Sequence, residues 1–141
     1  MAFSPQQIAP IDFDASTAVG VNIPLNGPAV FISNYQTKDA IKNNLINFFL
    51  TNPGERILNP LFGGGLRSFI FEQITLDNLT FLREDINYKL QLFFPNIIVN
   101  ELAVTGDNDS NQLEVILKYS VSNTNIVDTL EINLNNETIT L

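Results

Sequence analysis

The sequence of 141 residues contains no cysteine, no histidine and no tryptophan. The absence of cysteine excludes disulfides and thiolate metal sites, and the absence of histidine removes the commonest catalytic base at neutral pH. No apolar run is long enough to span a membrane, and the N-terminus lacks the pattern of a secretion signal. We therefore expect one domain with a real hydrophobic core, made and assembled in a cytoplasm, without a cofactor.

Basic residues are scarce as well. Seven Lys+Arg face fifteen Asp+Glu, which gives a net charge of −8. Phosphate binding depends on clustered basic residues, so the composition argues against nucleic acid as a direct partner. Only 16% of the residues are charged while 45% are apolar, which is low in charge for a free soluble protein. We expect partner proteins to cover part of this apolar surface.

What the sequence does have is a stretch dense in proline and glycine, NPGERILNPLFGGGLRSFIFE, at residues 52–72. Pro53-Gly54 stops a preceding helix, because proline lacks an N–H and glycine readily takes positive φ. The glycine run that begins at Gly63 permits a tight backbone path, and apolar residues from Leu66 onward recur at helical spacing. These features predict a specified shape rather than a plain surface loop. A phosphate-binding loop is rejected, because the lysine of that motif and the strand before it are missing.

Two amphipathic helices flank this stretch. The first is predicted over residues 38–50, with Thr37 as its N-cap and three asparagines opposite its apolar face. The second is predicted over residues 76–94, after a cap at Thr75, and Pro95 ends it. The apolar face of the first consists of Ile41, Leu45, Phe48 and Phe49, and the asparagines are Asn43, Asn44 and Asn47. The seam of the second consists of Leu79, Leu82, Ile86, Leu90 and Phe93.

The second predicted helix has two further features. Asp85 and Lys89 are spaced for a favourable ion pair. A second apolar flank beside the seam indicates either a wider core face or a contact with another subunit, and both alternatives are open. This flank consists of Phe81, Tyr88 and Leu92.

From residue 97 the apolar period changes to two, which predicts strands. Polar turns at 106–111 and 123–125 separate three of them. On the first strand we expect Ile98, Leu102 and Val104 to share a face, and the second presents Leu113, Val115, Leu117, Tyr119 and Val121. Asp107 and Asp109 in the first turn lack the spacing and closing glutamate of a calcium loop, so no metal is expected.

These elements predict an α+β fold, in which two or three helices pack on a small antiparallel C-terminal β-meander. Ile139 and Leu141 either extend an edge of that sheet or hang free. Residues 1–32, which hold four prolines, are expected to form an extended N-terminal arm beside a domain at residues 33–141. The arm either lies on its own domain or docks on neighbouring subunits.

The order of residue types in the central stretch resembles the small baseplate wedge protein family of contractile phage tails, which also occurs in type VI secretion baseplates. The resemblance covers roughly residues 33–135. The positions that carry it are Pro53, Gly54, Glu55, Arg56, Pro60, Phe62, Gly63, Leu66, Phe71 and Glu72.

In many phage members of that family a Glu-Pro-Arg triplet at the end of the long helix contacts the core helix bundle of the wedge. Here Phe94-Pro95-Asn96 stands at that place, so only Pro95 matches and both charges are gone. Either the partner surface is more apolar there, or Glu55 and Arg56 carry more of the polar contact. We therefore add Arg67, Phe94 and Pro95 to the family positions as interface candidates.

The resemblance implies a structural virion component and no enzyme. Such a subunit would link the wedge core helix bundle to the first sheath ring and help to initiate sheath assembly by β-strand augmentation. Its partners would be other baseplate wedge proteins and the tail sheath subunit, in multiple copies, with neither nucleic acid nor membrane. It would lie in the tail baseplate of the virion after assembly in the host bacterial cytoplasm.

Two other functions stay open. A free-standing adaptor or binding domain would be stable and fully soluble without partners. A lysozyme-like cell-wall glycosidase is considered because relatives have carried that label, and it needs two carboxylates about 5–5.5 Å or 6.5–9.5 Å apart. The candidates are Glu55, Glu72, Asp77 and Asp85. Against this function, tryptophan is absent, and Glu55 beside Arg56 and near Arg67 is interpreted as a paired structural carboxylate.

Overall fold

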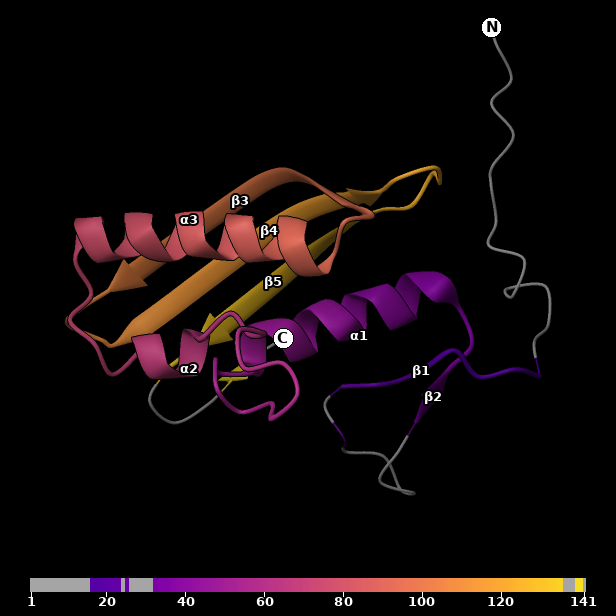
Figure 1. Cartoon of the computed structure of the whole chain (residues 1–141). Coiled ribbons are helices and arrows are strands. Elements are labelled where there is room, and N and C mark those ends of the chain that lie inside the picture. The colour runs from indigo at the N-terminus through magenta and orange to yellow at the C-terminus, as the bar shows by residue number, and fades with distance from the viewer. Residues whose placement is uncertain (1–15, 24, 26–31, 136–138, 141) are drawn as a thin grey trace, which may run out of the picture.

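A computed structural model describes residues 16–23, 25, 32–135 and 139–140. They form a four-stranded antiparallel sheet in the order β3-β4-β5-β6, with the helices packed on one face (Figure 1). A two-stranded sheet, β1-β2, lies beside the first helix. The predicted α+β class is confirmed.

The first helix, α1, spans Thr37–Leu50 and ends before Pro53, as predicted. Its N-cap is Gln36, which has extended dihedrals and makes no side-chain capping bond. The predicted cap at Thr37 is therefore wrong by one position. The Ala40 N–H donates to the Gln36 carbonyl oxygen at 3.1 Å, which makes Thr37 the first helical residue. The apolar face of α1 buries Leu45, Ile46, Phe48 and Phe49.

The helix after the glycines, α2, is a single turn at Leu66–Phe69. The long helix, α3, spans Leu76–Phe93, and the Thr75 hydroxyl accepts a hydrogen bond from the Asn78 N–H at 3.2 Å, so the predicted cap is confirmed. The middle of its predicted seam is buried, at Leu82, Ile86 and Leu90. No helix within the described residues is long and apolar enough to cross a membrane.

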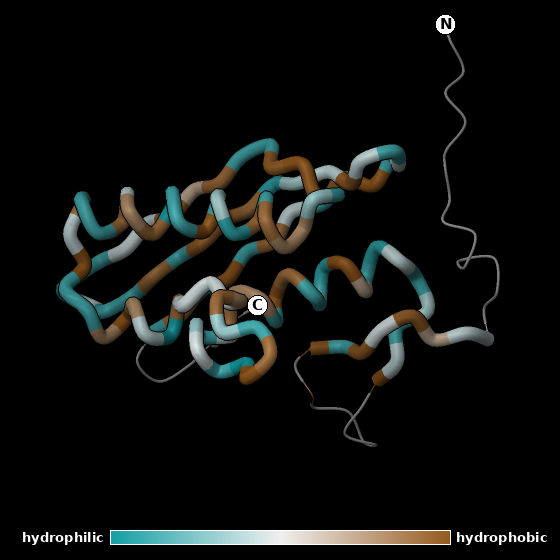
Figure 2. Tube along the Cα trace, viewed as in Figure 1, coloured by the Kyte–Doolittle hydropathy of each residue, from teal (hydrophilic) through white to brown (hydrophobic). Residues whose placement is uncertain are grey.

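The main sheet consists of β3 (Ile97–Asp107), β4 (Gln112–Val121), β5 (Val127–Leu134) and β6 (Ile139–Thr140). The predicted three-stranded meander is confirmed, and β6 adds two residues to its edge by pairing with the end of β5. Every residue predicted for the inner face of β4 is buried. These side chains form one core with buried residues of α1, α2 and α3. Hydrophobic and hydrophilic positions alternate along these elements in Figure 2.

A β-bulge interrupts β3 at Asn100. Val99 pairs with Tyr119 and Glu101 pairs with Lys118, so Asn100 is an extra residue on β3. One extra residue exchanges the inward and outward faces of a strand. Ile98 is consequently exposed, and the prediction that it shares a face with Leu102 and Val104 is wrong.

Part of the expected N-terminal arm lies against its own domain. β1 (Gly20–Val21) pairs with β2 (Ser33–Asn34), and Gly20 packs against Ala40 of α1. The rest of the arm, at residues 1–15, 24 and 26–31, is outside the described residues. The division of the chain at residue 32 stays a prediction.

Candidate functional site

The glycine run lies against the last turn of α1. The Gly64 N–H donates to the Phe48 carbonyl oxygen at 2.8 Å, and the Gly65 N–H to that of Thr51 at 3.2 Å. Gly63 has a φ of +132°, and a Cβ added to it would lie 2.4 Å from the Thr51 oxygen. Glycine is required here for a close backbone approach. The amides of Gly64 and Gly65 bond to the last turn of α1 and to the residue that caps it, so they are not free to bind a phosphate.

The residues that carry the family resemblance separate into a buried and an exposed set. The buried residues are Phe62, Gly63 and Leu66, and Phe94 is partly buried. The exposed residues are Pro53, Gly54, Glu55, Arg56, Pro60, Arg67, Phe71, Glu72 and Pro95. The exposed residues, and the exposed part of Phe94, can meet another protein while the domain stays folded.

Phenylalanine rings gather where α1, α3 and the loop before α2 meet. The ring of Phe48 stands edge to face with Phe62 at 5.4 Å and with Phe94 at 5.6 Å, measured between centroids. Such pairs contribute about 0.5–1.5 kcal/mol each beyond area burial. Phe94 therefore supports the fold itself, and an interface role for it stays a prediction.

Glu55 and Arg56 each interact with a different partner. The Glu55 carboxylate accepts from the backbone N–H of Asn52 at 3.1 Å and from its side-chain amide at 3.0 Å. The guanidinium carbon of Arg56 lies 3.7 Å from the centre of the Phe62 ring. Within the described residues no ion pair joins Glu55 to Arg56 or Arg67, so the predicted arginine pairing is corrected. The tight turn brings Asn52 to the carboxylate, and the ring holds the arginine away from it.

Lys89 connects α3 to the glycine run. Its ammonium lies 2.7 Å from the Asp85 carboxylate, which confirms the predicted pair, and it also donates to the Gly63 carbonyl oxygen at 3.2 Å. The side chain is largely buried, at 15% exposure. Burial strengthens such charge-assisted contacts relative to surface pairs, so Lys89 fixes the loop against the helix.

The four carboxylates considered for hydrolysis are all exposed. Two of them, Glu72 and Asp85, line the same hollow of about 220 Å³ between α2 and α3. That volume is below the roughly 300–1,000 Å³ of usual ligand sites. Asp85 is also held by Lys89. Glu55 and Asp77 do not line this hollow, so the structure brings two of the four candidates together.

Asn43 is a residue that sequence reasoning misplaced. It was expected to face water or a partner opposite the apolar face of α1, yet it is only 7% exposed. Its side-chain oxygen accepts from the Ile23 N–H at 2.8 Å, and its amide donates to the Asn22 side chain and the Asp39 carbonyl oxygen. The prediction is wrong because the segment after β1 covers that side of the helix. The residue pattern of α1 alone cannot reveal that another segment covers this side of the helix.

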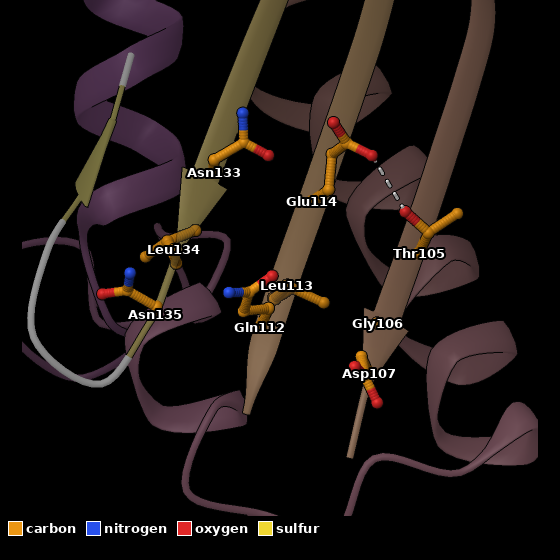
Figure 3. A pocket seen from close by; sticks show the side chains of 9 residues that line it. All are labelled: Thr105, Gly106, Asp107, Gln112, Leu113, Glu114, Asn133, Leu134 and Asn135. Atoms are coloured by element: carbon orange, nitrogen blue, oxygen red, sulfur yellow. Dashed lines mark hydrogen bonds between the residues drawn. The ribbon is translucent and has the colours of Figure 1, made fainter. Parts of the chain in front are cut away.

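A hollow of about 400 Å³ opens at the end of the main sheet (Figure 3). Thr105, Glu114 and Asn133 lie side by side on three neighbouring strands, and the Thr105 hydroxyl donates to Glu114 at 3.3 Å. In the adjoining hairpin turn the Ser110 hydroxyl donates to the Asp107 carboxylate at 2.7 Å, which lowers the pKa of that carboxyl. No cluster of potential metal ligands occurs within the described residues. The contacts stay within the hairpin and do not converge on a ligand position.

The second apolar flank of α3 faces outward. Phe81 is 69% exposed and Tyr88 is 65% exposed, and Leu92 is exposed beside them. The alternative of a wider core face is therefore wrong. A contact between this flank and another subunit stays a prediction.

Comparison with known proteins adds the following findings. The family model described as baseplate wedge protein gp25 matches residues 35–126. Among solved structures, a Geobacter sulfurreducens protein whose name provisionally calls it a tail lysozyme matches with a TM-score of 0.62 and 20% identity, over 76% of this chain and 97% of that chain. At that identity the likeness shows the fold alone. The anti-feeding prophage baseplate matches with a TM-score of 0.48 and 20% identity, over 79% of each chain. No curated protein sequence matches the chain.

Proposed function

The chain belongs to the baseplate wedge protein gp25 family, and we propose on this basis that it links the wedge core helix bundle to the first sheath ring. A structural role among the baseplate proteins of a phage tail follows from the family itself. The proposal adds contact with the sheath subunit, help in starting sheath assembly, several copies in each baseplate, and assembly in the host bacterial cytoplasm. The observation that carries it is the family match, which covers α1, α2, α3, β3 and β4.

The surface proposed to face the wedge is the exposed part of the central stretch together with the end of α3. Arg56, Arg67, Phe71 and Glu72 offer both charges and an apolar ring, and Pro95 is exposed at the helix end. The Glu-Pro-Arg charges are missing at the end of α3. The charged side chains of the central stretch therefore make the polar contacts with the wedge in this proposal.

The edge proposed to receive a sheath strand is that of β5. Among the described residues β5 is paired on its outer side only at Asn133 and Leu134, by β6. On the other edge of the sheet, β3 carries the Asn100 bulge, and bulges discourage regular pairing. The β5 edge therefore offers a template for β-augmentation that no bulge interrupts, at residues 127–132.

The outward-facing N–H groups of that edge follow from the hydrogen-bond ladder, and one of them, that of Thr129, also donates to the Asp128 carboxylate at 2.9 Å. The Val121 N–H donates to the Ile126 carbonyl oxygen at 3.0 Å. Because bonded and non-bonded pairs alternate in an antiparallel ladder, the N–H groups of Thr129 and Glu131 point away from β4. Both side chains are exposed, so proline at either position removes an outward donor without removing an inner bond.

Tails assembled with Thr129→Pro/Glu131→Pro test the proposal. We expect baseplates that contain the chain but carry little or no sheath when particles are counted by electron microscopy. Thr129→Ala/Glu131→Ala is the matched control and is expected to support full sheaths. Normal sheaths on baseplates that contain the proline variant, or on baseplates that lack the chain, would contradict the proposal.

We propose that the chain has no enzymatic activity. The carboxylates that share a hollow are exposed, and one of them is paired with Lys89. Peptidoglycan incubated with the purified full chain is expected to stay intact. Cleavage that disappears in Glu72→Gln or Asp85→Asn would establish the glycosidase instead.

A further inference from the structure

The loop between α1 and α2 is braced by its own hydrogen bonds. We call residues 52–61 the tip loop. The Gly54 N–H donates to the Pro60 carbonyl oxygen at 2.7 Å, which closes the loop at its base. Inside it the Glu55 N–H donates to the Asn52 carbonyl oxygen at 3.2 Å, while the Glu55 carboxylate accepts two bonds from Asn52. The tip loop therefore has a defined shape before any partner arrives.

This braced loop displays apolar side chains to solvent. Ile57 is 95% exposed, Leu58 is 99% exposed and Leu61 is 68% exposed. In Figures 1 and 2 the loop projects beyond the helices, and its outer bend is hydrophobic. Single exposed apolar residues are ordinary on protein surfaces. A cluster of them on a projecting, internally bonded loop is less ordinary and marks a contact surface, whereas neighbouring Phe62 is buried.

The charge beside the apolar tip is positive. Arg56 lies over the Phe62 ring, and no carboxylate of the described residues forms an ion pair with it. Glu55, the only acid of the tip loop, is already bonded to Asn52. The adjoining hollow of about 290 Å³ is lined by Arg56 and by neutral residues, mainly asparagine and phenylalanine. In a chain of net charge −8 this is a local cationic spot.

We propose that the tip loop docks into an apolar pocket on another baseplate protein, a pocket that takes Ile57, Leu58 and Leu61 and has a carboxylate at its rim for Arg56. The inference rests on the proposed function in one respect, that the chain works inside a baseplate. Because the loop is already ordered, little conformational entropy is lost on docking. The planar guanidinium is pre-positioned for a two-pronged bond to a carboxylate.

A lipid surface fits the same loop less well. Anionic membranes attract clusters of Lys and Arg, whereas the tip loop holds one arginine in an acidic chain. Interfacial segments also use tryptophan as an anchor, and the sequence has none. A protein pocket matches both the rigid outline and the single cation.

The test uses the full chain co-expressed with the other baseplate proteins of its own tail. Ile57→Ser/Leu58→Ser is expected to lower incorporation into purified baseplates by about tenfold or more, the loss expected when central apolar anchors are removed. Ile57→Leu/Leu58→Met keeps the tip apolar and is expected to be incorporated normally. Arg56→Gln is expected to reduce incorporation, with Arg56→Lys intermediate. The Ile57 and Leu58 side chains are exposed and make no contact that the fold depends on, so the thermal melting temperature of those purified variants should match that of the wild type. Arg56→Gln also loses the contact with the Phe62 ring, so a small fall in its melting temperature is expected.

A photo-crosslinking amino acid at position 58 identifies the occupant. Crosslinking to a different baseplate protein, together with the loss in the serine variant, supports the proposal. Crosslinking to a second copy of the chain, crosslinking to lipid, or normal incorporation of the serine variant overturns it. If the wild-type chain itself is absent from baseplates, the proposed function fails. If the wild type and the serine variant enter equally, only the docking inference fails.

Discussion

At the residue scale, Tyr119 places a polar hydroxyl inside the hydrophobic core. It is fully buried, and its hydroxyl finds no hydrogen-bond partner among the described residues. Burial raises the pKa of Tyr119 above its usual value of 10.0, and the nearby Asp128 and Asp39 carboxylates raise it further. The folded chain therefore holds the phenolic proton more tightly than the unfolded chain does. The corresponding stability is fully present below pH 10 and is lost as the pH rises above it.

Replacing Tyr119 tests whether its hydroxyl lacks a partner and whether its ionisation destabilises the fold at high pH. Tyr119→Phe is expected to leave the free energy of unfolding at pH 7 unchanged or to raise it by about 1 kcal/mol, because an unpartnered hydroxyl is removed. It should also reduce the loss of stability between pH 9 and pH 11, measured by urea unfolding. Tyr35→Phe, at an exposed position, is the control. A fall of more than about 1 kcal/mol at pH 7 would show that the hydroxyl has a stabilising partner.

The glycines of the central stretch differ in what they tolerate. Gly63→Ala is expected to lower the free energy of unfolding by about 3 kcal/mol, because positive φ and a clash with the Thr51 carbonyl act together. Gly54→Ala also places a side chain at positive φ but meets nothing within 4 Å, so about 1 kcal/mol is expected. Denaturant unfolding of the two variants measures the difference. Equal losses of unfolding free energy in the two variants would show that the clash with the Thr51 carbonyl contributes nothing.

At the scale of elements, Asn43 joins β1 and its following residues to α1. Asn43→Ala is expected to lower the free energy of unfolding by about 2 kcal/mol, since it leaves the partly buried Ile23 amide unpaired. Hydrogen exchange at that amide should accelerate in parallel. Asn44→Ala, on the exposed side of the same helix, should change neither quantity. Unchanged exchange at Ile23 in the Asn43 variant would mean that other contacts hold the segment.

The β3 bulge sets which side chains of that strand reach the core. Deletion of Asn100 is expected to lower stability by about 3 kcal/mol or more, because a one-residue shift turns part of the strand to the wrong face. Asn100→Ala keeps the residue count and should cost less than about 0.5 kcal/mol. Thermal melts followed by circular dichroism separate the two. A deletion variant as stable as the substitution would show that the strand tolerates either register.

The helices and strands themselves were predictable because their signals are local. The spacing of Leu82, Ile86 and Leu90, and the alternation along β4, repeat at the period of the element that they form. The burial of Asn43 and the exposure of Ile98 were not predictable in this way. One depends on a segment distant in sequence that covers the helix, and the other on an extra residue that only the pairing with β4 reveals.

The location of the candidate site was predictable from the sequence. Which of its side chains are buried and which are exposed was not. Proline and glycine spacing marked residues 52–72 as a specified shape. The same spacing could not tell that Phe62 points inward while Leu58 points outward, because both are large and apolar. Their separation is decided by the packing of Phe62 on Phe48 and Phe93.

At the scale of the whole molecule, charge repulsion opposes apolar attraction between copies. The chain carries a net charge of −8 and exposes Ile57, Leu58 and Phe71. We expect the isolated chain to stay dispersed at pH 7 in low salt and to associate as its carboxylates become protonated near pH 4. At about 1 M salt, where the screening length falls to roughly 3 Å, association should begin at higher pH. Light scattering follows it, and association independent of both pH and salt would contradict this balance.

The ammonium of Lys89, described above between Asp85 and the Gly63 carbonyl oxygen, has a mechanical consequence. A force applied to the tip loop, which ends two residues before Gly63, can reach α3 through that side chain without passing along the backbone of α2. Tension at the tip is therefore shared with the long helix that lies along the sheet. A pull on the loop would therefore load α3 as well as the backbone of α2.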